Sequence, residues 1–296
     1  MTNQEIYKKI KEECKLRALS PTTQKDYEKS FRVFLRYHNE RPAIELGEPE
    51  IREFLLHLLE TGRTSGTVNV YNSGLRFVFG AVLDKTLNYQ KIPRRRIHRE
   101  LPRIMSKTDI SKFFSVIDNL RDTAIFETVY GGGLRLSEIA KLRVQDIDSE
   151  GMRIFVHQGK GGKDRYTLLS QRNLELLRQY WKEYRPNHPN GYLFYPKSHK
   201  ERCVTSRCIQ DAFRKHRIQA GLPNDFTVRT LRNCFATHLL ESGVDVCRIK
   251  QLMGHTHIQS TTFYLHLLNF DGSIKSPLDT LSKKRGRKPK AVTDDA

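Results

Sequence analysis

The sequence lacks any long hydrophobic run. No stretch approaches the roughly 18–20 apolar residues of a membrane-spanning helix, and the longest candidate, residues 77–83, is far too short. The first residues show no basic region followed by an apolar segment, so we expect no secretory signal. A lipidation motif and an amphipathic anchor are also missing, which argues against an anionic membrane surface as partner. We therefore expect a cytoplasmic, nucleoid-associated protein with no membrane partner.

Cysteine is scarce and scattered. The five cysteines form no C-x-x-C pair and are odd in number, a pattern that argues against a disulfide framework or a zinc site. A reducing cytoplasm fits this usage better. His255 and His257 have no third ligand in view. We expect no metal and no cofactor.

Acidic residues are outnumbered. The 296 residues hold 52 Lys or Arg and 33 Asp or Glu, so the formal net charge is +19. Such an excess in a chain with ordinary apolar content indicates a folded protein with a polyanionic partner, most often nucleic acid. The length suggests two domains, possibly three.

Helical patterns fill the first third of the chain. Ser20 and Pro21 are typical of a helix start, and apolar residues recur at helical spacing over 51–59. A further helix over 66–83 is expected to turn Val70 and Leu75 inward. We predict a small helical DNA-binding domain over 1–88.

Two basic segments interrupt this pattern. Residues 91–103 hold six Lys or Arg and two prolines, and proline disfavours helix on both sides of itself. We predict a linker over 89–103, either a solvated hinge or a strap in which Arg94, Arg95 and Arg96 follow a phosphate backbone. The end of the chain, 276–296, is expected to be a flexible basic tail that is either only solubilising or adds affinity for phosphates.

A second domain is expected over 104–275. Two strand-like runs, 153–157 and 165–169, flank a glycine-rich turn and predict a β-hairpin. Around it the pattern is helical. The predicted fold is therefore mainly α with a small β-hairpin or three-stranded sheet, in which the later helices cover 172–184, 205–220, 228–242 and 245–253.

Several residues of this region could act on a phosphodiester. Attack at phosphorus concentrates negative charge on non-bridging oxygens, which arginine forks can hold without a metal ion. A tyrosine can supply the oxygen nucleophile, and a lysine can protonate the departing 5′ oxygen. Glu138 lies three residues after Arg135 and can orient it. The candidate catalytic residues are Arg135, Lys160, Arg229, Arg232, His255 and Tyr264.

The order and spacing of these residues resemble the tyrosine recombinase, or phage integrase, family. The resemblance extends over roughly 106–270 and is carried by four segments and a tyrosine: 133–138, 158–165, 229–240, 252–255 and Tyr264. The helical region in front resembles the core-binding domain of the family, and the second domain its catalytic domain.

The resemblance implies roles for single residues. Arg135 and Arg232 would clamp the scissile phosphate, with Glu138 at an auxiliary acidic position. Lys160 would be the general acid on a hairpin that faces the minor groove, where Lys163 and Arg165 would contact DNA. His255 would bind a phosphate oxygen or tune the nucleophile, and Tyr264 would form a 3′-phosphotyrosyl link. Double-stranded DNA, a homotetramer on paired sites and accessory DNA-binding proteins are the implied partners.

One segment departs from the family pattern. Arg229 stands where the family usually has histidine, and Asn233 replaces a common, less critical histidine. Arginine cannot accept a proton, so the role of a base at this position is lost or moves to His255 or water.

Three functions stay open at this point. The first is a site-specific recombinase serving integration, excision or transposition of a mobile element. The second is a regulator without chemistry that uses residues 235–254 as a helix-turn-helix. The third is a topoisomerase with the same tyrosine chemistry.

Overall fold

The computed structural model describes residues 1–97, 101, 103–157, 164–196 and 203–267, with side chains through residue 265. The chain divides into two compact units, residues 1–100 and 101–296, and each is described by itself. Lys160, Lys163 and the basic tail over 276–296 lie outside the described residues.

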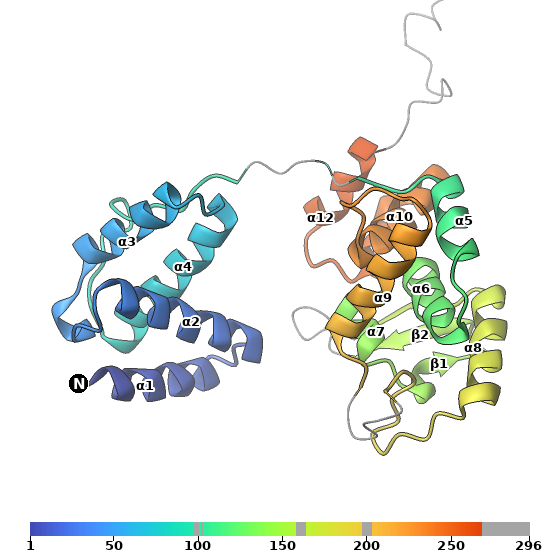
Figure 1. Cartoon of the computed structure of the whole chain (residues 1–296), viewed down its shortest axis with the longest axis horizontal. Helices are drawn as coiled ribbons and strands as arrows, with labels where there is room; N and C mark the ends of the chain where they lie inside the picture. The colour runs from blue at the N-terminus through green and yellow to red at the C-terminus, as the bar shows by residue number, and fades with distance from the viewer. Residues whose placement is uncertain (98–100, 102, 158–163, 197–202, 268–296) are drawn as a thin grey trace, which may run out of the picture. The chain divides into compact units, whose positions relative to one another are not determined.

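All the secondary structure that is described in the first unit is helical (Figure 1). Ser20 caps α2 by accepting from the Thr23 N–H, and Pro21 is its first residue, as the sequence predicts. α4 continues into one π-helical turn, η2. The elements are α1 (Asn3–Leu16), α2 (Pro21–Tyr37), the 3-10 turn η1 (Ala43–Glu45), α3 (Glu48–Glu60), α4 (Ser65–Phe77) and η2 (Val78–Val82).

Phenylalanine rings build the core of this unit. Phe34 makes edge-to-face contacts with Phe54 and Phe79, with ring centroids 5.5 and 5.6 Å apart. The prediction that Val70 faces inward is wrong, because its side chain is 48% exposed. The buried face of α4 instead carries Val68 and Leu75, which are seven residues apart and so lie two helical turns apart on one side.

The start of the basic segment is bound to α4. The side chain of Asn69 accepts from the Arg95 N–H and donates to the Arg95 carbonyl, both at 2.9 Å. Asn72 donates to the carbonyls of Ile92 and Pro93, and Ile92 is buried in the core of the unit. The segment expected as a linker over 89–103 therefore begins as part of the first unit.

The second unit combines helices with one small sheet. Its strands are antiparallel in the order β1–β2–β3, with Ile154 opposite Thr167, and α6 packs against α8, α10 and β3. The elements are α5 (Lys107–Ser115), α6 (Leu120–Gly132), α7 (Leu136–Ala140), η3 (Val144–Asp146), β1 (Ile147–Asp148), β2 (Arg153–Val156), β3 (Arg165–Leu168), α8 (Gln171–Tyr184), α9 (Ser206–Gln219), α10 (Val228–Glu241), α11 (Val246–Met253), α12 (Gln259–Thr262) and η4 (Phe263–Leu267).

This architecture confirms the predicted fold class of a mainly helical protein with a small three-stranded sheet. The four predicted helices after the hairpin agree with α8 to α11 to within a residue or two at each end. α10 is the central helix of the unit, since its residues from Thr230 to His238 are all buried. Within the described ranges, no helix is both long and apolar enough to cross a membrane.

Candidate active site

The site is built around the carboxylate of Glu138. Gly133 is the C-cap of α6. Its φ of +61° is left-handed, and a Cβ there would overlap the ring of Phe235. Arg135 follows as the N-cap of α7, and Glu138 reaches back to it. One carboxylate oxygen accepts from the Arg135 backbone N–H at 2.7 Å and the other from its Nη1 at 2.7 Å. The spacing of three residues thus orients Arg135, as the sequence analysis expected.

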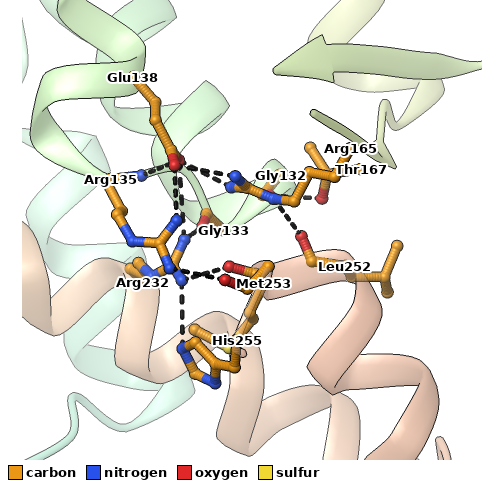
Figure 2. Close-up of polar contacts among 11 residues, drawn as sticks. Gly132, Gly133, Arg135, Glu138, Arg165, Thr167, Arg232, Leu252, Met253 and His255 are labelled. Carbon is orange, nitrogen blue, oxygen red and sulfur yellow. Dashed lines mark hydrogen bonds and ion pairs between the residues drawn. The ribbon is translucent and has the colours of Figure 1, made fainter. Parts of the chain in front are cut away.

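A second arginine reaches the same carboxylate from β3. Arg165 Nη1 and Nη2 donate to the two oxygens of Glu138 at 2.8 and 2.7 Å (Figure 2), which is the bidentate geometry that fits guanidinium to carboxylate. Its side chain is only 7% exposed. We expected Arg165 to contact DNA; in the structure its guanidinium is instead bound to Glu138.

Three arginines hold three consecutive carbonyls at the end of α11. Arg165 Nε donates to the Leu252 carbonyl at 2.8 Å, Arg232 Nη2 to Met253 at 2.6 Å and Arg135 Nη2 to Gly254 at 3.0 Å (Figure 2). Arg232 also donates to the Gly133 carbonyl. The last carbonyls of a helix lack intrahelical partners and carry partial negative charge. The cluster therefore fixes the turn that precedes His255.

Gly254 allows this turn to fit. Its φ is +61°, a conformation that residues with a Cβ rarely adopt. A Cβ on Gly254 would lie 2.7 Å from Cδ of Arg165. The backbone can therefore approach the arginine cluster only with glycine at this position.

Positive charge exceeds negative charge in this cluster. Burial alone would raise the pKa of Glu138, but the hydrogen bonds and charge of Arg165, joined by Arg135, lower it to about 2. Burial lowers the pKa of Arg232 to about 9, helped by the charge of Arg135. Glu138 is therefore ionised and Arg232 stays charged at neutral pH. Three guanidiniums face one carboxylate, which leaves the site attractive to an anion.

His255 is neutral in this setting. Burial, together with the positive charge of Arg232, lowers its pKa to about 4. Arg232 Nη2 lies 3.3 Å from His255 Nε2, and because arginine only donates, Nε2 accepts. The hydrogen is then on Nδ1, which lies 2.9 Å from the Thr261 hydroxyl. Arg232 thus fixes Nε2 as the acceptor, and Nδ1 donates to the Thr261 hydroxyl.

Tyr264 lies in the same region, next to α10 and α11. Its side chain is 7% exposed and packs with Phe235, Ile249 and Met253. The ring is nearly parallel to that of His255, with centroids 6.3 Å apart. Its hydroxyl donates to Asn233 Oδ1 at 3.1 Å. Burial raises the pKa of Tyr264, while the charges of Arg232, Arg229 and Arg135 act in the opposite direction.

Arg229 lies at the edge of the site. It is exposed, although its charge contributes to the lowered pKa of His255 and opposes the rise that burial causes in the pKa of Tyr264. Arg229 and Arg232 lie three residues apart on α10, yet only Arg232 is buried among the carbonyls. Arg229 therefore supplies electrostatic potential from the solvent side.

The structure brings together most of the predicted catalytic set. Arg135, Arg232, His255 and Tyr264 converge with Glu138, whereas Lys160 lies outside the described residues. Asn233 and Thr261, as direct partners of Tyr264 and His255, were not predicted. Among the described residues no three His, Cys, Asp or Glu side chains lie together as a metal site requires.

The exposed arginines of the first unit form a separate group. Arg94 donates to the Ser73 hydroxyl at 3.0 Å and Arg95 Nε to the Ser65 hydroxyl at 3.1 Å. Both side chains and that of Arg96 are exposed. Serine hydroxyls of α4 thus hold two of the three arginines at the surface of the unit.

Comparison with known proteins identifies the family of the chain. Residues 97–269 match the phage integrase family, and residues 6–89 match the N-terminal SAM-like domain of phage integrases. The putative integrase/recombinase y4qK of Sinorhizobium fredii is 32% identical over 97% of this chain and 92% of its own length. Tyrosine recombinase XerA of Pyrococcus horikoshii is 34% identical over 72% of this chain and 73% of its own.

A solved structure shows the same fold. The Tn1549 transposon integrase in complex with transposon right end DNA superposes with a TM-score of 0.68, at 18% identity, over 92% of this chain and 96% of that one. The family match covers more than half of the chain and includes the segments that hold Arg135, Arg232, His255 and Tyr264. The chain belongs to the phage integrase family of tyrosine recombinases, the enzymes of site-specific recombination that cleave and rejoin DNA strands.

Proposed function

We propose that this recombinase cleaves DNA through Tyr264 and serves the integration, excision or transposition of a mobile element. The observation that carries the proposal is the convergence of Arg135, Arg232 and His255 on a region that also holds the Tyr264 hydroxyl. The names of its relatives, an integrase/recombinase among them, and the transposon integrase with the same fold support the mobile-element role.

The proposed step is a displacement at phosphorus. The Tyr264 oxygen attacks, the new bond from this oxygen to phosphorus forms, and the bond from phosphorus to the 5′ oxygen breaks. The phenol proton passes to water, and the 5′ oxygen leaves as a hydroxyl after taking a proton from Lys160 as general acid. The 3′-phosphotyrosyl ester keeps the energy of the broken bond, so a 5′ hydroxyl from another strand can reverse the step without a cofactor.

The arginines would stabilise the transition state. Arg135 is 22% exposed, and its Nε has no partner among the residues that the structure describes. Arg232 is already fixed by the Gly133 and Met253 carbonyls. Donors held in place before the reaction require no reorganisation as charge develops on the phosphate. Arg229 would add positive potential rather than act as a base.

Double-stranded DNA is the proposed partner, with contacts to phosphate from Arg94, Arg95 and Arg96 in the first unit and from Lys163 in the second. Exchange between two sites breaks both strands of each, and one tyrosine serves each break. The resemblance to the family implies a homotetramer on paired sites, with the segment after Tyr264 proposed to join the subunits. The same chemistry would serve a topoisomerase, but a site-specific recombinase agrees with the family.

The interpretation as a regulator without chemistry is not favoured. A helix-turn-helix built from α10 and α11 would have no need of Tyr264, whose ring lies nearly parallel to that of His255 with centroids 6.3 Å apart.

A covalent-trapping assay tests the proposal. The protein is incubated with nicked or supercoiled DNA, including the DNA flanking its own gene, in the presence of a chelator. We expect a band that resists denaturant and is absent with Tyr264→Phe. Tight binding without such a band would contradict the proposal and favour a regulator.

A further inference from the structure

The Tyr264 hydroxyl has a defined partner before any DNA is bound. It donates to the side-chain oxygen of Asn233 at 3.1 Å, and both residues are 7% exposed. Asn233 directly follows Arg232 on α10. An asparagine amide does not ionise, so it can direct the phenol hydrogen but cannot take the proton.

The rest of the tyrosine is held by apolar contacts. Its ring packs with Phe235, Ile249 and Met253 and lies parallel to that of His255. Such contacts are non-directional and do not set where the hydroxyl hydrogen points. Within the described part of the chain, the bond to Asn233 is the only hydrogen bond of this hydroxyl, and it directs that hydrogen.

Arg229 and Asn233 share one face of α10, since residues four apart on a helix are neighbours. The charge of Arg229 acts against the increase that burial causes in the pKa of Tyr264. One side chain thus supplies positive potential and the other a hydrogen-bond acceptor, and neither is a base. This face has the chemistry to orient the tyrosine rather than to deprotonate it.

We propose that Asn233 is the positioning residue of the nucleophile. Its amide oxygen holds the Tyr264 hydrogen on the α10 side, so that a lone pair of the phenol oxygen is available to the phosphorus bound by Arg135 and Arg232. This inference rests on the proposed function of Tyr264 as nucleophile. It adds that α10 orients the tyrosine through an amide and that the phenol proton leaves to water.

The first test is the rate of covalent complex formation at saturating DNA. Asn233→Leu keeps a similar volume but has no acceptor, and we expect it to be about tenfold slower, the usual effect of one hydrogen bond. Asn233→His restores a ring nitrogen as acceptor and should recover most of the rate. Glu241→Gln, on the exposed end of α10, is the matched control and should match wild type. An unchanged or faster rate with Asn233→Leu would overturn the proposal.

A second test separates positioning from a general effect on the site. In Tyr264→Phe, hydrogen peroxide can serve as a small nucleophile, whose oxygen bonds to phosphorus as the 5′ oxygen leaves. This reaction does not need Asn233, so adding Asn233→Leu to Tyr264→Phe should leave peroxide cleavage unchanged. An equal loss in both reactions would show that Asn233 acts on the phosphate site or the fold, which would contradict the proposal.

A third test needs no DNA. With tyrosines labelled at ¹³Cζ, Tyr264→Phe assigns the resonance of Tyr264 among the twelve tyrosines. We expect Asn233→Leu to shift this resonance and Glu241→Gln to leave it in place. No shift would mean that the bond does not exist in solution and would refute the proposal. Failure of wild type to form any covalent complex, with the shift present, would instead refute the function proposed for Tyr264.

Discussion

The two units hold their arginines in different ways. In the second unit, Arg165 and Arg232 are buried and bound to a carboxylate and to backbone carbonyls, partners that are themselves fixed. In the first unit, Arg94 and Arg95 are exposed and rest on serine hydroxyls. Buried partners define geometry, whereas exposed guanidiniums are screened by salt and mainly neutralise phosphate.

The excess of positive charge therefore serves two purposes. A sequence with a net charge of +19 does not reveal which arginines contact DNA. The burial of each side chain distinguishes the two groups of arginines. We expect changes in the buried group to affect chemistry more than affinity, and changes in the exposed group to affect affinity and its salt dependence.

Loss of Arg232 should have the largest effect. Arg232→Ala removes a donor from the site where negative charge develops, and such losses slow catalysis by about 10²–10³-fold. The rate of covalent complex formation at saturating DNA measures it. Arg232→Lys, which keeps the charge without the fork, should recover little of the rate. A rate within a few fold of wild type would mean that Arg232 does not stabilise the transition state.

Arg165 tests the contrast further, because its side chain is 7% exposed and paired with Glu138. Arg165→Gln would release Glu138 and the Leu252 carbonyl, and displacement of the neighbouring arginines by about 1 Å can slow cleavage by up to about a hundredfold. The salt dependence of DNA binding should stay unchanged. A decrease in the salt slope by about 0.9 would instead identify Arg165 as a phosphate contact.

Strong acid should weaken the buried group, because it protonates Glu138. The pKa of Glu138 is lowered from 4.5 to about 2 by its arginines, so its contribution to stability is complete above pH 4.5 and is lost as the pH falls toward 2. The stability of wild type, measured by thermal unfolding, should decline over this pH range. In Glu138→Gln the part of the decline that comes from Glu138 should be missing. An identical pH dependence in both proteins would contradict the assigned role of the carboxylate.

The exposed arginines should give the smallest effect on chemistry. Arg94→Ala together with Arg95→Ala removes two expected phosphate contacts and should reduce the slope of log affinity against log salt by about 0.9 for each. Cleavage at saturating DNA should stay near wild type. A loss of cleavage that persists at saturating DNA would show that the exposed arginines also act in the reaction, which would contradict the distinction between the two groups.

Much of the fold could be predicted from local patterns. Apolar spacing and caps such as Ser20 are consequences of helix geometry, which acts over a few residues. The orientation of Arg135 by Glu138 was predictable for the same reason, since both lie within one turn. Val70 was misplaced because it lies five residues before Leu75, which puts the two side chains about 140° apart around the helix, whereas Val68 shares the side of Leu75.

The role of Arg165 was harder to predict, because β3 inverts the usual pattern. Tyr166 and Leu168 are exposed, whereas Thr167 is buried and donates to the Gly132 carbonyl. Alternation along a strand places Arg165 on the face of Thr167, but apolar residues at the other positions hid this signal. The bond between Asn233 and Tyr264 joins two segments far apart in sequence and required the tertiary structure.

The most direct test of the account identifies the residue that becomes attached to DNA. The trapped covalent complex is digested with nuclease and protease, and its peptides are mapped by mass spectrometry. We predict a nucleotide joined through its 3′ phosphate to Tyr264, formed with chelator present. Attachment to another side chain, or through a 5′ phosphate, would contradict the assignment of Tyr264 as the nucleophile that forms a 3′-phosphotyrosyl link.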